Sequence, residues 1–162
     1  EEQFKIGELD VKVIGTPGHT PACVCYVIKN NVFIGDTLFM PHLGTARVDF
    51  PDGSAEQLFN SIQKLFSYPD DTNLYVGHDY PKENIQPSCK TTVKDQKENN
   101  VILNAKTTID EYIASRHNLD KSLRVPNLLL PALQVNLRAG RLPKQNANNI
   151  QHLMLPLNVL DP

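Results

Sequence analysis

The sequence predicts an α/β fold in which an antiparallel or mixed β-sheet is covered by helices. Three observations predict this class. Residues 4–14 and 15–37 contain alternating or β-branched segments separated by glycine and asparagine turns, which is typical of strands. Residues 54–66 combine an N-cap signal with one apolar stripe, which is typical of a helix that covers a sheet. A further apolar strand at 73–76 completes a strand, helix and strand order found in layered α/β proteins.

The first half of the chain predicts antiparallel strands. Residues 4–14 alternate apolar and polar side chains on both sides of Gly7, which predicts two short strands of a half-buried sheet. Two further strands follow within residues 15–37, with Lys29-Asn30-Asn31 as the polar turn between them. Because antiparallel strands fold back on each other, both open ends of this hairpin lie at the same rim of the sheet.

A histidine and an aspartate flank this hairpin. His19 comes before its first strand and Asp36 directly after its second, so the two side chains are expected to meet at the rim. An imidazole and a carboxylate are two ligands of a borderline divalent metal. Each alone has an ordinary explanation, a solvated loop histidine or a turn aspartate. Residues 74–80 repeat the pattern of strand, glycine and the polar pair His78 and Asp79, which favours the metal interpretation.

The segment after the hairpin predicts a helix. Ser54 and Gln57 form a capping box, in which the serine hydroxyl accepts from a free backbone N–H and the glutamine reciprocates. Pro69 closes the segment. The apolar residues after the cap fall on one stripe suited to packing on a sheet: Leu58, Phe59, Ile62, Leu65 and Phe66.

The C-terminal third predicts mainly helices. Residues 91–115 are helix-compatible, and Asn99-Asn100 separates two helices within them. A second capping box at 108–111 marks the start of the later helix. Pro131 begins a short helix that ends at Gly140.

Composition and charge are those of an ordinary globular chain. The 162 residues are 40% hydrophobic and 21% charged, which is enough for one domain with a core. The net charge of −2 gives no electrostatic reason to bind nucleic acid or an anionic membrane. No apolar run approaches the ~20 residues that cross a bilayer.

The three cysteines indicate a reducing environment. An odd number argues against a disulfide framework and favours the cytoplasm or another reducing compartment such as the mitochondrial matrix. Cys23 and Cys25 alternate along a strand, so both are expected to point to one face and to pack as small hydrophobes. Cys89 lies in a polar stretch and is expected to be exposed.

Three short motifs occur in a characteristic order: Gly18-His19-Thr20, Gly35-Asp36 and Gly77-His78-Asp79-Tyr80. In this order they resemble the C-terminal half of the metallo-β-lactamase fold superfamily. The resemblance implies half of an αββα sandwich over residues 1–143. The composition of residues 144–162, rich in Asn with two Pro, predicts an extended tail. The superfamily's first metal motif, His-x-His-x-Asp-His, does not occur in this sequence. The chain therefore resembles the C-terminal portion of a longer protein that carries further metal ligands.

A fourth segment points to one branch of that superfamily. Residues 44–50, Gly-Thr-Ala-Arg-Val-Asp-Phe, resemble the Gly-x-x-Arg-x-Asp-Phe signature of the persulfide dioxygenase (sulfur dioxygenase) branch. The resemblance implies one Fe(2+) held by His19, Asp36 and an upstream histidine, with His78 beside the site as a hydrogen-bonding group. The implied reaction oxidises glutathione persulfide, or a similar low-molecular-weight persulfide, with dioxygen to sulfite and the thiol.

The resemblance also implies substrate contacts. Arg47, Tyr80 and Arg138 match residues that hold the glutathione part of the substrate in that branch, and Asp49 is placed to orient Arg47. A guanidinium suits a carboxylate because its planar fork donates two parallel hydrogen bonds. The ordinary alternatives are a solvated or salt-bridged arginine and a half-buried tyrosine.

Two alternatives stay open. The neighbouring branch, glyoxalase II or hydroxyacylglutathione hydrolase, is a dinuclear zinc thioesterase, and it implies two Zn(2+) per chain with His78 on the second ion and Asp36 between them. The other alternative is that this polypeptide alone is an inactive half-fold or interaction fragment. A homodimer is compatible with each. The metal content of the full-length protein separates an oxygenase from a hydrolase.

Overall fold

The computed structural model describes residues 2–81, 83–124 and 126–154. These residues fall into two compact units, Glu1–Ser122 and Leu123–Pro162. The predicted division into a domain over 1–143 and a tail over 144–162 stays a prediction, and residues 155–162 of that tail lie outside the described residues. None of the helices within the described ranges is both long and apolar enough to cross a membrane.

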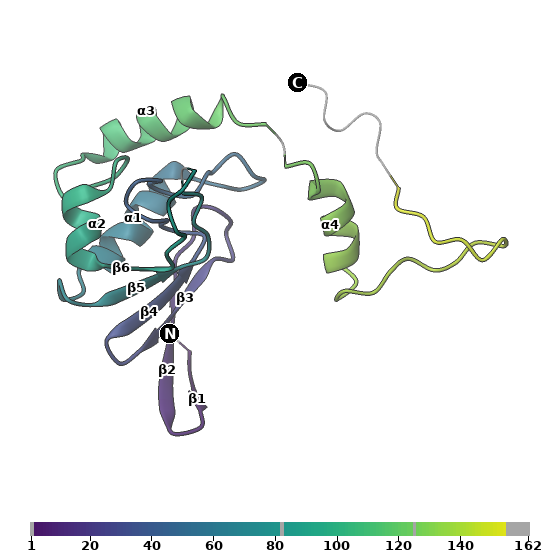
Figure 1. Ribbon diagram of the computed structural model, residues 1–162, viewed down its shortest axis with the longest axis horizontal. Coiled ribbons are helices and arrows are strands. Elements are labelled where there is room, and N and C mark those ends of the chain that lie inside the picture. The colour runs from purple at the N-terminus through teal and green to yellow at the C-terminus, as the bar shows by residue number, and fades with distance from the viewer. Residues whose placement is uncertain (1, 82, 125, 155–162) are drawn as a thin grey trace. The chain divides into compact units, whose positions relative to one another are not determined.

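The first unit is built on one six-stranded sheet whose strands follow each other in chain order (Figure 1). All neighbours pair antiparallel except β4 and β5, which are parallel. The sheet is therefore mixed, and the predicted α/β class is confirmed. The strands are β1 Gln3–Ile6, β2 Leu9–Gly15, β3 Val24–Ile28, β4 Asn31–Gly35, β5 Asn73–Val76 and β6 Lys90–Thr92.

The predicted hairpin has the expected turn. Ile28 pairs with Asn31 and Val27 with Val32, so β3 and β4 fold back over the Lys29-Asn30 corner. The later strand β6 was not predicted, because its three residues include two threonines and a lysine with no apolar alternation. It forms because it pairs with β5, a long-range contact that local sequence does not encode.

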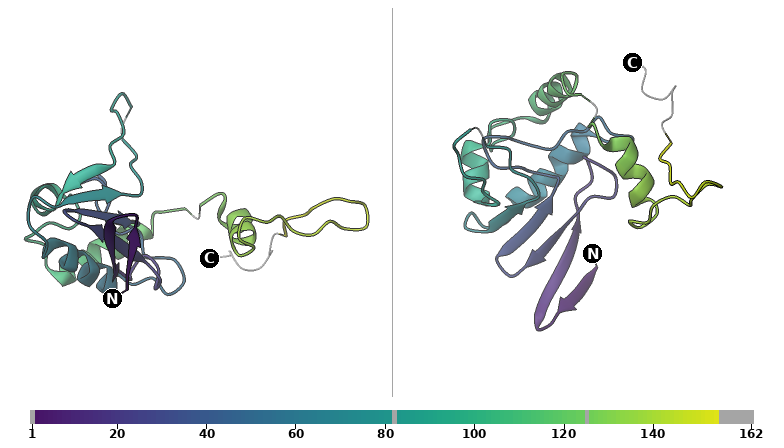
Figure 2. Two further views of the ribbon diagram at one scale, coloured as in Figure 1. Left: turned by 90° about the horizontal axis from the view of Figure 1, so that it is seen from below. Right: turned by 45° about the vertical axis from the view of Figure 1, so that its right-hand side comes forward.

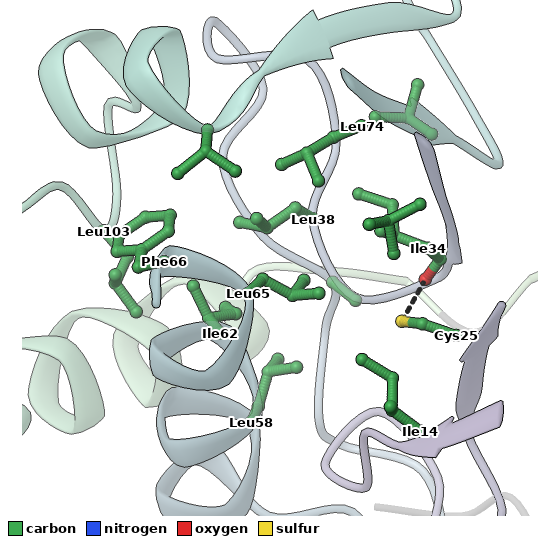
Figure 3. Packing of buried hydrophobic residues seen from close by; sticks show 14 of the residues in the cluster. Ile14, Cys25, Ile34, Leu38, Leu58, Ile62, Leu65, Phe66, Leu74 and Leu103 are labelled. Carbon is green, nitrogen blue, oxygen red and sulfur yellow. Dashed lines mark hydrogen bonds between the residues drawn. The ribbon is translucent and has the colours of Figure 1, made fainter. Parts of the chain in front are cut away.

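Helix α1, Ala55–Phe66, covers one face of the sheet. The Ser54 hydroxyl accepts a hydrogen bond from the Gln57 backbone N–H at 3.2 Å, which confirms the serine half of the predicted capping box. The reciprocal half is wrong, because the Ser54 N–H donates to the Gly18 carbonyl instead of to the Gln57 side chain. The apolar stripe faces the sheet and packs with side chains from the strands (Figure 3). The fully buried members of this core include Leu58, Ile62 and Leu65 from α1 and Val32, Ile34 and Leu74 from the sheet.

The other helices of the first unit are α2, Val93–Asn99, and α3, Ile109–Asp120. Figure 2 shows that the helices gather along the central strands and β6, whereas the β1–β2 hairpin extends away from them. The Thr108 and Glu111 capping box predicted for α3 is present. The second unit contains α4, Leu129–Asn136, so the predicted bounds were wrong: the helix begins two residues before Pro131 and ends at Asn136 rather than at Gly140.

The cysteines occupy different environments. Cys25 is fully buried and its Sγ donates to the Ile34 carbonyl oxygen at 3.6 Å. Burial raises the pKa of the Cys25 thiol, since a thiolate would lose its hydration there. Cys23 is partly buried just before β3, and Cys89 is exposed, as predicted.

These environments predict an order of thiol reactivity. Since the thiolate is the nucleophile, brief alkylation with iodoacetamide is expected to modify Cys89 first and Cys25 last. Mass spectrometry of the digested protein after timed quenching measures the three rates. In denaturant the rates are expected to converge, and a Cys25 that reacts as fast as Cys89 in the native protein would contradict the described core.

Candidate metal centre

Asp36 and His78 meet because their strands are parallel neighbours. Asp36 follows β4 and His78 follows β5 after one glycine, so both side chains leave the same end of the sheet. His78 Nε2 lies 3.3 Å from Asp36 Oδ1. The predicted convergence of these two residues therefore comes from strand pairing.

Two glycines allow this close approach. Gly35 has a φ of +50°, a conformation that costs an L side chain about 1–2 kcal/mol, and it turns the chain sharply before Asp36. Gly77 lies against that turn: a Cβ there would lie 3.2 Å from Asp36 Oδ1 and 3.3 Å from the Gly35 carbonyl. A side chain at Gly35 would strain the turn through its positive φ, and one at Gly77 would crowd the Asp36 carboxylate.

His19 reaches the same carboxylate from the loop between β2 and β3. Its Nε2 lies 3.7 Å from Asp36 Oδ2, the oxygen that does not face His78. The loop is held against α1 at two places: the Ser54 N–H at its N-cap donates to the Gly18 carbonyl at 2.8 Å, and the Ser61 hydroxyl in its middle donates to the Pro17 carbonyl at 2.7 Å. The predicted meeting of residues 19 and 36 at the rim is thus present in the structure.

The tautomer of His19 follows from its second contact. His19 Nδ1 lies 2.7 Å from the Arg47 carbonyl oxygen. A carbonyl oxygen only accepts hydrogen bonds, so Nδ1 carries the proton and, in the neutral imidazole, Nε2 presents its lone pair toward Asp36. A lone pair facing a carboxylate is favourable only when a cation or a proton lies between them. This is the arrangement that metal-binding histidines adopt.

The donor set fits a borderline divalent ion but is incomplete in this chain. His19 Nε2 and the Asp36 carboxylate are suitable ligands for iron or zinc, and His78 is a third nearby donor. Across residues 2–81, 83–124 and 126–154, no group of three or more histidine, cysteine, aspartate or glutamate side chains is arranged to hold an ion by itself. A catalytic ion generally takes three protein ligands, so a further ligand is needed.

Arg47 and Asp49 form an ion pair beside this centre. Arg47 Nε and Nη2 each donate to one Asp49 oxygen at 2.5 Å, and the guanidinium lies over the Phe50 ring. Phe50 also contacts the His19 ring edge to face, with 5.1 Å between the ring centroids. The hydrogen bonds from Arg47 lower the pKa of Asp49, and Asp49 raises the pKa of Arg47. Asp49 therefore fixes the Arg47 side chain, and the predicted role of the pair in substrate binding stays a prediction.

This pair makes a small, pH-dependent contribution to stability. The folded pKa of Asp49 lies below its ordinary value of 3.8, so the stabilisation is complete above about pH 4 and is lost as the pH falls through the lower folded value. Because the carboxylate is a third exposed, Asp49→Asn is expected to cost about 0.5–1 kcal/mol at neutral pH. Urea unfolding at several pH values measures the difference.

The matched control is Asp10→Asn. Asp10 pairs with Lys5 at 2.6 Å on the β1–β2 hairpin with an 83% exposed side chain, where screening leaves little net energy. Its effect is expected to be small at every pH. An Asp49→Asn cost that persists in acid, or grows there, would contradict the ion-pair explanation.

The remaining predicted residues divide into two groups. Tyr80 stacks on the His78 ring, with 5.7 Å between centroids, and its side chain is largely exposed. Arg138 belongs to the second compact unit, so its predicted role at this centre stays a prediction. One proximity was not predicted: His42 Nε2, in the loop after β4, lies 3.3 Å from Asp79 Oδ1, in the loop after β5. No sequence spacing pairs these two residues.

Comparison with known proteins agrees with this geometry. A sequence profile for the metallo-beta-lactamase superfamily matches residues 1–78. Glyoxylase B2 of Dictyostelium discoideum is 49% identical over 161 residues, which are 99% of this chain and 55% of that protein. Hydroxyacylglutathione hydrolase of Brucella ovis is 42% identical over 85 residues, which are 51% of this chain and 32% of that protein.

A solved structure extends the agreement to three dimensions. The crystal structure of ETHE1 from Myxococcus xanthus superposes with a TM-score of 0.76 at 33% identity, over 86% of this chain and 58% of that one. Residues 1–78 are part of a metallo-beta-lactamase superfamily domain, and members of this superfamily are metal-dependent enzymes, mostly hydrolases. The chain spans a little over half the length of ETHE1 and Glyoxylase B2. The resemblance inferred from the motifs is thereby confirmed at the level of the superfamily.

Proposed function

We propose that the full-length protein is a mononuclear non-haem iron dioxygenase that oxidises glutathione persulfide or a similar low-molecular-weight persulfide. The balanced reaction is RSSH + O2 + H2O giving RSH and sulfurous acid, which ionises to sulfite. The observation that carries a metal role is His19: its Nδ1–H is held by the Arg47 carbonyl, so that Nε2 faces Asp36. Two histidines and one carboxylate with open positions are the ligand set of non-haem Fe(II) oxygenases, and His19 and Asp36 would supply two of these three ligands.

The dioxygenase assignment is supported by a different set of observations. Residues 44–50 carry the Gly-x-x-Arg-x-Asp-Phe pattern, and ETHE1 is similar over 86% of the chain. His19 and Asp36 would hold the ferrous ion, which when bound would supply the redox chemistry that lets dioxygen react with the persulfide sulfur. The protein itself positions the His19 and Asp36 side chains, fixes Arg47 with Asp49, and places the His78–Tyr80 stack beside the site.

Substrate binding is proposed for Arg47, Tyr80 and Arg138. Arg47 is oriented by Asp49 and lies on the segment that contacts His19, so a carboxylate bound by it would place the thiol carrier near the centre. Tyr80 offers an exposed ring and hydroxyl next to His78. Hydroxyacylglutathione hydrolase acts, by its name, on a glutathione conjugate, which supports a small thiol as the carrier.

A dinuclear zinc thioesterase is the second candidate, and one observation favours it. Each oxygen of Asp36 faces a different histidine, Oδ2 toward His19 and Oδ1 toward His78. A carboxylate in that position can bridge two ions, with one histidine on each. His78 Nε2 lies 3.3 Å from Asp36 Oδ1, close enough to stand beside a single ion or to hold a second one, so the metal count decides the function of His78.

The experiment compares persulfide oxidation with thioester hydrolysis in an iron-loaded and a zinc-loaded form of the same purified protein. The full-length protein is loaded anaerobically with Fe(II) or with Zn(II), and each form is given glutathione persulfide with dioxygen or a glutathione thioester. The proposal expects oxygen uptake and an equal amount of sulfite only in the iron form. Thioester hydrolysis by a form holding two zinc ions, without oxygen uptake by the iron form, would replace it with the second candidate.

A further inference from the structure

One peptide group connects helix α3 to His19. The Arg47 carbonyl that accepts from His19 Nδ1 and the Val48 N–H belong to the same peptide unit. Val48 N–H donates to Asp120 Oδ2 at 3.0 Å. The structure has no cis peptide bonds among the described residues, so the N–H and the carbonyl of this planar group point in opposite directions. Asp120 therefore binds the N–H of this peptide group, and the carbonyl of the same group orients His19.

Asp120 is itself fixed by a buried partner. Arg116 Nη2 donates to Asp120 Oδ1 at 2.7 Å, and the two residues are only 4% and 7% exposed. Arg116 Nη1 also donates to the Thr45 carbonyl at 3.0 Å. The ion pair thus contacts the chain on both sides of Arg47, at Thr45 and at Val48.

A third side chain of α3, that of Tyr112, also contacts this segment. The Tyr112 hydroxyl lies 2.9 Å from Thr45 Oγ1, and both residues are buried. Burial raises the pKa of Tyr112 to about 12, so the hydroxyl stays neutral and able to donate. Three residues one turn apart on α3, at positions 112, 116 and 120, therefore hold the 45–48 segment.

We propose that Arg116 and Asp120 are positioning residues for the metal centre, acting on His19 through the Arg47–Val48 peptide group. The proposal rests on the metal role given to His19 above. A carboxylate that accepts from the N–H polarises the peptide group and makes its carbonyl a stronger acceptor. A stronger bond to Nδ1–H fixes the tautomer and ring orientation and makes Nε2 a better metal ligand. The buried pair is thus part of the site although it lies on a different element.

The test variant is Asp120→Asn. Its side-chain oxygen can remain on Arg116, but its NH2 then meets the Val48 N–H, donor against donor. In the full-length protein freed of metal, the proposal expects faster hydrogen exchange of the Val48 amide and a loss of the pure Nδ1–H tautomer of His19. Long-range ¹H–¹⁵N NMR measures the tautomer. After addition of Zn(II), the dissociation constant is expected to rise about 10–100-fold, the range for lost outer partners of metal ligands.

The matched control is Asp95→Asn. Asp95 accepts from the Thr91 hydroxyl at 2.7 Å on α2, in a network that no hydrogen bond among the described residues connects to His19. A general loss of stability would move the melting temperature in both variants, but only Asp120→Asn is expected to change the His19 tautomer. A folded Asp120→Asn protein with unchanged tautomer and unchanged Val48 exchange would overturn the proposal.

A measurement on the unsubstituted protein covers the case in which Asp120→Asn does not fold. Addition of Zn(II) is expected to shift the Val48 amide resonance, because the peptide group transmits the change at His19, and to leave the Val13 amide of the β1–β2 hairpin unchanged. A Val48 resonance that does not respond to saturating Zn(II) would overturn the proposal. Failure of the protein to bind any metal would instead remove the proposed function, and the metal-free tautomer of His19 would still test the positioning.

Discussion

Asp36→Ala is expected to abolish tight metal binding by the full-length protein. The carboxylate is the one group that both histidines face, with 3.7 Å to His19 Nε2 and 3.3 Å to His78 Nε2. Loss of a direct ligand is expected to cost more than the roughly 10–100-fold in affinity that loss of an outer partner costs. Titration with Fe(II) or Zn(II) against a competing chelator measures the change. The gain in melting temperature on adding metal is expected to vanish with it.

His42→Ala is the control for this prediction. His42 lies in the loop after β4, near the centre, but its imidazole contacts Asp79 rather than Asp36. Its removal is expected to leave the metal dissociation constant within a few-fold of the original. If His42→Ala weakened binding as strongly as Asp36→Ala, or if Asp36→Ala bound metal normally, the ligand assignment would be wrong.

Gly18→Ala is expected to destabilise the protein by about 2–4 kcal/mol, combining overpacking with an unfavourable backbone conformation. A Cβ at residue 18 would lie 2.4 Å from Leu58 Cα and 2.5 Å from its backbone nitrogen, so the loop or helix α1 would have to move. The φ of +146° adds strain for any L side chain. Since His19 is the next residue, the shift is also expected to weaken metal binding.

Gly7→Ala separates the two causes. Gly7 also has a positive φ, +58°, but nothing lies within 4 Å of its would-be Cβ. It is expected to cost only the conformational part, about 1–2 kcal/mol. Chemical denaturation of both variants measures the difference, and equal costs would show that the contact between the Gly18 loop and α1 is looser than described.

Much of the candidate centre could be predicted because its signals are local. His19, Asp36 and His78 each follow or precede a short strand and stand next to a glycine, and strand pairing brings strand ends to one rim. The apolar stripe of α1 and its Ser54 cap could be predicted for the same reason, because helix periodicity and capping depend on residues only a few positions apart.

The contacts that orient the centre could not be predicted. His19 is fixed by a backbone carbonyl at residue 47, and backbone groups leave no residue-type signal in a sequence. Asp120 lies 72 positions from Val48, and on the sequence it is one charged residue among several on α3. Its role depends on which face of α3 packs on the 45–48 segment, which only the tertiary structure determines.

The most direct test is a crystal structure of the metal-loaded full-length protein. The ion is expected to have His19 Nε2 and an Asp36 carboxylate oxygen within about 2.0–2.2 Å, while His19 Nδ1 keeps its hydrogen bond to the Arg47 carbonyl. An ion held by other residues, with the imidazole of residue 19 turned toward solvent, would contradict the assignment of this rim as the metal centre.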